Sequence, residues 1–88
     1  MRRPPEFFGE QELDLIYVAR KLDDALRLEG VLTQAGLDYL VEPDLYKGGV
    51  IFQSERIGAF FYVAPELGES ARGTVAAAGY KPYDVEDP

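Results

Sequence analysis

The sequence predicts an α+β domain with the ferredoxin-like βαββαβ order, in which two helices cover one face of a four-stranded antiparallel sheet. The main observation is an internal repeat: residues 17–37 run from YVA to AGL, and residues 62–80 run from YVA to AGY. Each copy has the pattern of an apolar strand, a helix and a glycine stop before another strand. Because β-α-β crossovers are right-handed, the two units share one sheet with the first and third strands central.

The first copy begins with a strand over residues 13–20, which are rich in β-forming side chains and apolar from Leu15 to Ala19. Residues 22–35 follow with apolar positions at helical spacing and with acidic residues in the first turn, where the helix dipole favours them. Gly36 supplies the left-handed end of this helix. We expect a second strand over residues 37–42, ended by Pro43.

A long connection over residues 43–58 joins the two copies. Hairpin loops usually take about 2 to 5 residues, so this connection is either an extended ribbon with residues 50–52 as an extra strand, or a loop that contacts a partner. The candidate partner-contacting residues are Tyr46, Lys47, Gly48, Gly49 and Arg56.

The second copy begins with a strongly β-forming strand over residues 59–64, and Pro65 suits the start of the helix that follows. Gly68 and Gly73 each cost this helix about 1 kcal/mol relative to alanine, so we expect it to be the softer helix. A fourth strand is predicted over residues 80–85. The domain thus covers residues 13–85, with an N-terminal tail over residues 1–12 and a C-terminal tail over residues 86–88.

The repeat also predicts which side chains share a face of the sheet, because matched residues should point the same way. The residues expected to face the helices are Ile16, Val18, Phe61 and Val63. The residues expected on the face without helices are Leu15, Tyr17, Phe60 and Tyr62. An apolar patch of this kind usually marks a contact surface, and we expect a homodimer joined through this face or an edge strand. The alternatives are a groove for a ligand or protein, and cover by the long connection or by Phe7 and Phe8.

Composition bounds the chemistry of the 88-residue chain, which has nine basic residues, sixteen acidic residues, no cysteine and no histidine. The net charge of -7 disfavours nucleic acid and anionic lipid surfaces. Histidine is the usual base at neutral pH and the commonest metal ligand, and cysteine supplies the thiolate nucleophile. Because the chain has neither residue, we predict a non-enzymatic protein without a cofactor. A hard cation near Asp38, Glu42 and Asp44 stays an alternative. No signal peptide or apolar stretch of about 20 residues is visible, so we expect a cytoplasmic protein.

Several segments resemble a bacterial family of small domains labelled as prokaryotic signal-transducing proteins. They are IYVA at 16–19, DA at 24–25, GVL at 30–32, QAGL at 34–37, YVAPE at 62–66 and AR at 71–72. The resemblance covers residues 13–80 and implies the ferredoxin-like fold of the nitrogen-regulatory PII proteins. In those proteins the loop between the second and third strands contacts partners, which would give residues 46–56 that role. The chain has no evident nucleotide signature, so the resemblance does not extend to ATP binding.

These observations predict a non-enzymatic binding or regulatory module that acts through self-association and partner contacts. The alternative is a small-molecule sensor, which would need a concave pocket with convergent polar groups where an assembly module needs a flat apolar patch. A third hypothesis is an RNA-recognition domain, since residues 15–22 resemble the first-strand motif of such domains and Tyr17 and Phe60 could stack on bases. The excess of acidic residues disfavours it, because nucleic-acid affinity depends on phosphate neutralisation.

Overall fold

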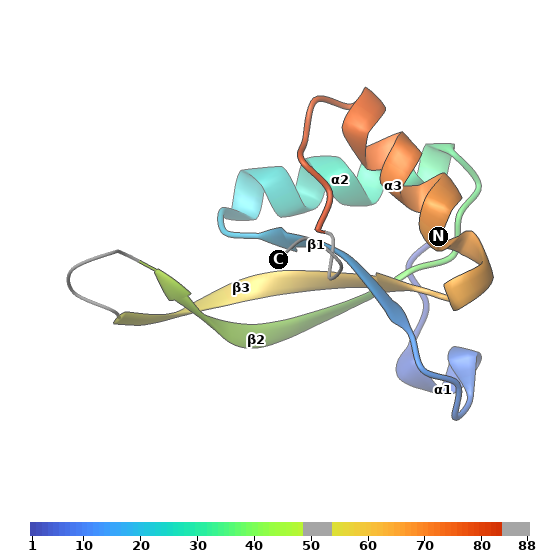
Figure 1. Cartoon of the computed structure of the whole chain (residues 1–88), viewed down its shortest axis with the longest axis horizontal. Helices are drawn as coiled ribbons and strands as arrows, with labels where there is room; N and C mark the ends of the chain where they lie inside the picture. Colours follow the sequence, from blue (N-terminus) through green and yellow to red (C-terminus); the bar gives the residue numbers. More distant parts are fainter. Residues whose placement is uncertain (49–53, 84–88) are drawn as a thin grey trace.

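The computed structural model describes residues 1–48 and 54–83, and within them a three-stranded antiparallel sheet has the order β1-β3-β2. Two longer helices, α2 and α3, lie together on one face of the sheet, whereas the short helix α1 lies on the other side (Figure 1). The elements are α1 (Pro5–Phe8), β1 (Asp14–Ala19), α2 (Leu22–Gln34), β2 (Leu40–Gly48), β3 (Ser54–Val63), the 3-10 helix η1 (Pro65–Leu67) and α3 (Gly68–Ala77).

The prediction of a four-stranded sheet with two helices is therefore wrong. No described residue after α3 belongs to a strand, and α1 adds a helix that the sequence did not predict. The chain does return to the outer edge of β1, where the backbone N–H of Tyr83 donates to the carbonyl of Ile16 at 2.7 Å. Pro82 precedes this bond and has no N–H, so it cannot extend a ladder. Residues 84 and 85 of the expected strand lie outside the described residues.

Strand β2 also differs from the prediction, because it begins at Leu40 and continues through Pro43 to Gly48. Pro43 is opposite Ala59 in the ladder with β3. A proline is tolerated there because β2 is an edge strand, where a missing N–H can face away from the sheet. Strands β2 and β3 thus form the extended ribbon, which projects beyond the last pair of β1 with β3 (Figure 1). The extra strand expected over residues 50–52 lies outside the described residues.

A β-bulge at Ile16 changes the faces of the residues that follow it in β1. Leu15 is opposite Tyr62, but Tyr17 is opposite Phe61, so two steps along β1 match one step along β3. Ile16 and Phe61 are fully buried against the helices, as the sequence predicts. Beyond the bulge the alternation is inverted: Tyr17 packs on the helix-side core, and Val18 is opposite Phe60 on the other face. The predicted orientations of Tyr17 and Val18 are wrong for this reason.

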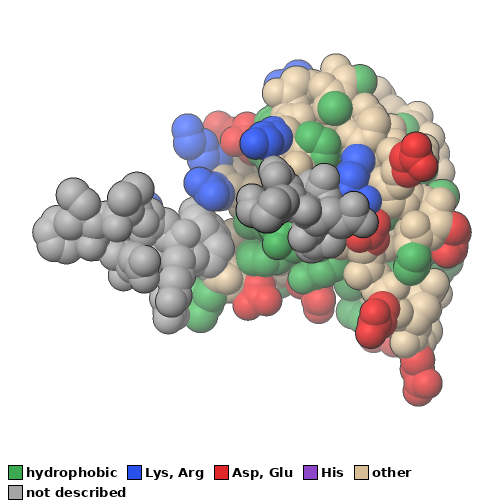
Figure 2. All heavy atoms as spheres, in the orientation of Figure 1, with side chains coloured by type: hydrophobic (Ala, Val, Ile, Leu, Met, Phe, Trp, Pro, Cys, Tyr) green, Lys and Arg blue, Asp and Glu red, His purple; other side chains and the backbone are tan. Residues whose placement is uncertain are grey.

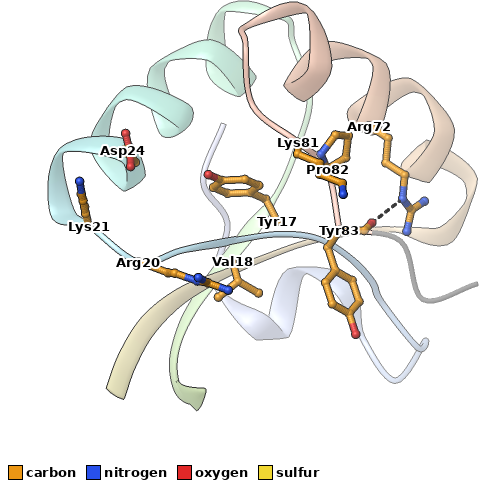
Figure 3. Close-up of a pocket in the computed structure, with 9 residues that line it drawn as sticks. All are labelled: Tyr17, Val18, Arg20, Lys21, Asp24, Arg72, Lys81, Pro82 and Tyr83. Atoms are coloured by element: carbon orange, nitrogen blue, oxygen red, sulfur yellow. Dashed lines mark hydrogen bonds between the residues drawn. The ribbon is translucent and has the colours of Figure 1, made fainter. Parts of the chain in front are cut away.

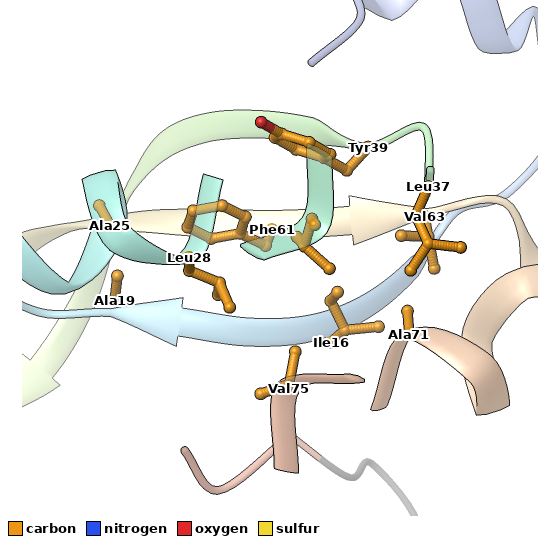
Figure 4. Packing of buried hydrophobic residues seen from close by; sticks show 11 residues of the cluster. Ile16, Ala19, Ala25, Leu28, Leu37, Tyr39, Phe61, Val63, Ala71 and Val75 are labelled. Carbon is orange, nitrogen blue, oxygen red and sulfur yellow. The ribbon is translucent and has the colours of Figure 1, made fainter. Parts of the chain in front are cut away.

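The main hydrophobic core fills the space between the sheet and helices α2 and α3 (Figure 4). Its buried members are Ile16, Ala19, Ala25, Leu28, Leu32, Leu37, Tyr39, Phe61, Val63, Ala71 and Val75. Tyr39 is the one side chain here with a polar group, and its hydroxyl donates to the carbonyl of Glu29 and lies 3.0 Å from Thr33 Oγ1. The buried hydroxyl is therefore satisfied, and the core carries no unpaired polar group among the described side chains.

The first twelve residues, expected as a tail, contact the domain at several points. The N–H of Arg3 donates to the carbonyl of Tyr39 at 2.8 Å, and its guanidinium pairs with Asp38 at 2.8 Å. Phe8 is buried in a second, smaller cluster with Leu40 and Ala64. Helix α1 therefore covers one end of the sheet face that α2 and α3 leave open. None of the helices in the described chain has the length and apolarity needed to cross a membrane.

Candidate functional site

A cleft of about 750 Å³ lies beside β1, between the start of α2, helix α3 and the segment after α3 (Figure 3). Its volume falls within the range of about 300 to 1,000 Å³ that small-molecule sites usually have. The residues that line it are Tyr17, Val18, Arg20, Lys21, Asp24, Arg72, Lys81, Pro82 and Tyr83.

The cleft is basic although the molecule is acidic. Among the residues that the structure describes, four basic residues line it, against one acidic residue, Asp24. Figure 2 shows basic side chains gathered on the part of the molecule that carries the helices, with one acidic group among them and most acidic side chains toward the lower and right margins. Within residues 1–48 and 54–83, the side chains of Lys21 and Lys81 form no hydrogen bond or ion pair. A cleft lined by charges of one sign concentrates ligands of the opposite sign.

Arg72 connects the three elements that form one side of the cleft. From α3, its guanidinium makes two hydrogen bonds to the Asp14 carboxylate, at 2.8 and 3.0 Å, and one to the Leu15 carbonyl at 3.2 Å. Its Nε also donates to the carbonyl of Tyr83 at 3.0 Å. The hydrogen bonds from Arg72 hold the pKa of Asp14 below its ordinary value, an effect that burial partly opposes and the charge of Arg72 reinforces. Arg72 therefore positions the cleft wall.

Tyr17 forms the centre of the cleft, where its ring lies 5.4 Å from the ring of Tyr80. The hydroxyl of Tyr80 donates to Asp24 at 3.4 Å. Burial raises the pKa of Tyr17, and the charges of Asp24 and Tyr80 raise it further, so its hydroxyl stays neutral near pH 7. The bulge at Ile16 is what turns this ring toward the helices. The sequence gives no signal for that bulge, since no glycine marks it.

Only three of the four residues predicted for the open face of the sheet lie on the same face. Leu15, Phe60 and Tyr62 lie on the face without α2 and α3, each half-buried, whereas Tyr17 lies on the other side. Tyr62 packs against the Phe8 cluster, and burial raises the pKa of its hydroxyl, with smaller contributions from Asp44 and Glu42. The apolar patch therefore has Val18 where the sequence predicts Tyr17, and it has acidic neighbours.

The predicted partner loop is part of the β2–β3 ribbon. Tyr46, Lys47 and Gly48 end β2, and Arg56 of β3 is opposite Tyr46 with an exposed side chain. Gly49 lies outside the described residues. Arg56, whose side chain the structure describes, is not among the residues that line the cleft.

The acidic residues considered for a hard cation do not assemble into a site. Asp38 pairs with Arg3. In the part of the chain that the structure describes, no three acidic side chains lie close enough together to hold a metal ion.

Comparison of the chain with protein-family models, with curated proteins and with solved structures gave no match. The resemblance to the signal-transducing family therefore stays a prediction. The chemistry of the cleft has to be inferred from the residues of this chain.

Proposed function

We propose that this protein is a non-catalytic binding module that takes a small anionic molecule in the cleft beside β1. The observation that supports it is the gathering of four basic residues on one concave site in a chain of net charge -7. A sensor needs such a pocket with a few convergent polar groups, whereas an assembly module needs a flat apolar patch. The bulge turns Tyr17 away from the open face and gives the cleft an aromatic ring.

The strength of binding follows from the exposure of the cations. Lys21 and Lys81 are exposed, so each ion pair with a ligand contributes about 0.2 to 1 kcal/mol and is screened by salt. The rings of Tyr17 and Tyr83 and the apolar side chain of Pro82 add contact area. We therefore expect moderate affinity that falls as the salt concentration rises.

Calorimetric titration with inorganic phosphate, citrate and adipate at low and high salt tests this function. We expect heat of binding for at least one anion, reduced in the double variant Lys21→Gln/Lys81→Gln. Arg56→Gln is the matched control, because Arg56 is exposed on the ribbon and does not line the cleft. The proposal fails if none of the anions binds, or if the control loses as much affinity as the double variant.

A second candidate function is self-association through the open face of the sheet. It is favoured by Val18 and Phe60, which are opposite each other on that face and only half-buried, while Phe8 covers the end near Tyr62. The outer edge of β2 is a poorer surface for pairing, because Pro43 interrupts its row of donors.

A further inference from the structure

The cations of the cleft are divided between its two ends. Figure 3 shows Lys21 on one side of Tyr17, and Lys81 with Arg72 on the other. The topology agrees, since Arg20 and Lys21 follow the end of β1, whereas Tyr83 bonds to Ile16 near its beginning. A strand rises about 3.3 Å per residue, so the four residues from Ile16 to Arg20 separate the two ends by about 13 Å of backbone.

Each end of the cleft has one exposed lysine among the described residues. Lys21 lies at the first end with Asp24, whereas the side chain of Arg20 runs along β1 toward Val18 (Figure 3). At the other end Asp14 offsets Arg72, with which it forms two hydrogen bonds, and Lys81 remains. One carboxylate at each end would neutralise the lysine there, whereas a phosphate dianion at either end would bring more negative charge than that lysine can neutralise.

The middle of the cleft is apolar and aromatic. The Tyr17 ring lies between the two ends, and Pro82 lines the cleft near it (Figure 3). Phosphate is small enough to reach only one end at a time. A longer molecule with an apolar or planar body could contact both ends and rest on the ring.

We propose that the ligand is a dicarboxylate, with one carboxylate on Lys21, the other on Lys81, and an apolar or planar spacer against Tyr17. This inference rests on the proposed function and narrows its ligand class.

A nuclear magnetic resonance titration of the full chain at low salt compares dicarboxylates from succinate to suberate with their matched monocarboxylates. Adipate against hexanoate and terephthalate against benzoate are the main pairs, with inorganic phosphate as the small anion. One length should bind best, and its second carboxylate should tighten binding by up to about five-fold, the value of one exposed ion pair. In Lys21→Gln and in Lys81→Gln this advantage should disappear, while Arg56→Gln should keep it.

The outcomes separate this inference from the function on which it rests. If phosphate or hexanoate binds as tightly as adipate and its homologues, the dicarboxylate inference is wrong and anion binding stands. If no anion of the set shifts any resonance, anion binding fails and the inference fails with it. These outcomes are distinguished by comparing ligands on the unaltered chain. The test therefore does not require any variant to fold.

Discussion

Gly68 and Asp14 approach each other so closely that a β-carbon at position 68 would overlap the Asp14 carboxylate oxygen Oδ2. That oxygen accepts a hydrogen bond from Arg72 Nη1 at 2.8 Å, so the carboxylate cannot move aside without loosening the pair. The glycine, which costs helix propensity, is thus explained by the space that the Asp14–Arg72 pair needs.

Gly68→Ala should therefore fail to stabilise the protein, because the added methyl group displaces Asp14 from Arg72. Gly73→Ala is the matched control, since a β-carbon added at position 73 would meet nothing within 4 Å, and it should raise the free energy of unfolding by about 1 kcal/mol. Urea denaturation measures both. In the Asp14→Ala background the penalty at position 68 should vanish, and a penalty that persists there would contradict the explanation.

The stability of the fold should fall in acid because of Asp14. The pKa of this carboxyl is lowered in the folded chain from an ordinary value of 3.8, chiefly by its hydrogen bonds with Arg72. A group whose folded pKa is depressed stabilises the fold above its unfolded pKa, and that contribution is lost as the pH falls through the folded pKa. Asp14→Asn should lower stability at neutral pH and flatten its decline below about pH 5. Unfolding midpoints measured from neutral pH to below pH 5 test this prediction. An equal decline of stability with falling pH in Asp14→Asn and in the unaltered chain would contradict it.

The Asp14–Arg72 pair also shows how far the sequence can predict this fold. Hydrophobic spacing predicts β1, α2 and the buried Ile16 and Phe61, because these depend on local periodicity. It cannot predict the pairing of Asp14 with Arg72, which are 58 residues apart and meet only after α3 has packed on β1.

The errors of the sequence-based prediction have local causes in the tertiary structure. The bulge at Ile16 turns Tyr17 from the predicted open face into the cleft, and no residue type signals it. Pro43 is expected from sequence to end a strand, but the edge position of β2 removes its cost. The cleft itself draws its cations from the β1–α2 junction, from α3 and from the segment after α3, so it has no motif that could be recognised along the chain.

Self-association through the open face predicts a specific effect of Phe60→Lys. Placing a charge opposite Val18 should convert a dimer into a monomer, because burying an unpaired charge at an interface is costly. Light scattering coupled to size-exclusion chromatography reports the mass over a range of protein and salt concentrations. Ile57→Lys is the control, as Ile57 is 71% exposed on the ribbon and should leave the mass unchanged. A parental assembly that survives Phe60→Lys would exclude this face as the interface.

Arg72→Lys should release the segment after α3 and loosen the wall of the cleft, although the positive charge at position 72 is kept. Lysine can still pair with Asp14, but it lacks the planar fork that also holds the carbonyls of Leu15 and Tyr83. Hydrogen exchange at the Tyr83 amide, which donates to Ile16, should accelerate while the amides of β3 keep their protection. Arg56→Lys makes the same substitution outside the cleft and should change neither. Equal protection of Tyr83 in both variants would show that its bond to Ile16 alone holds the segment, and that Arg72 does not position the wall.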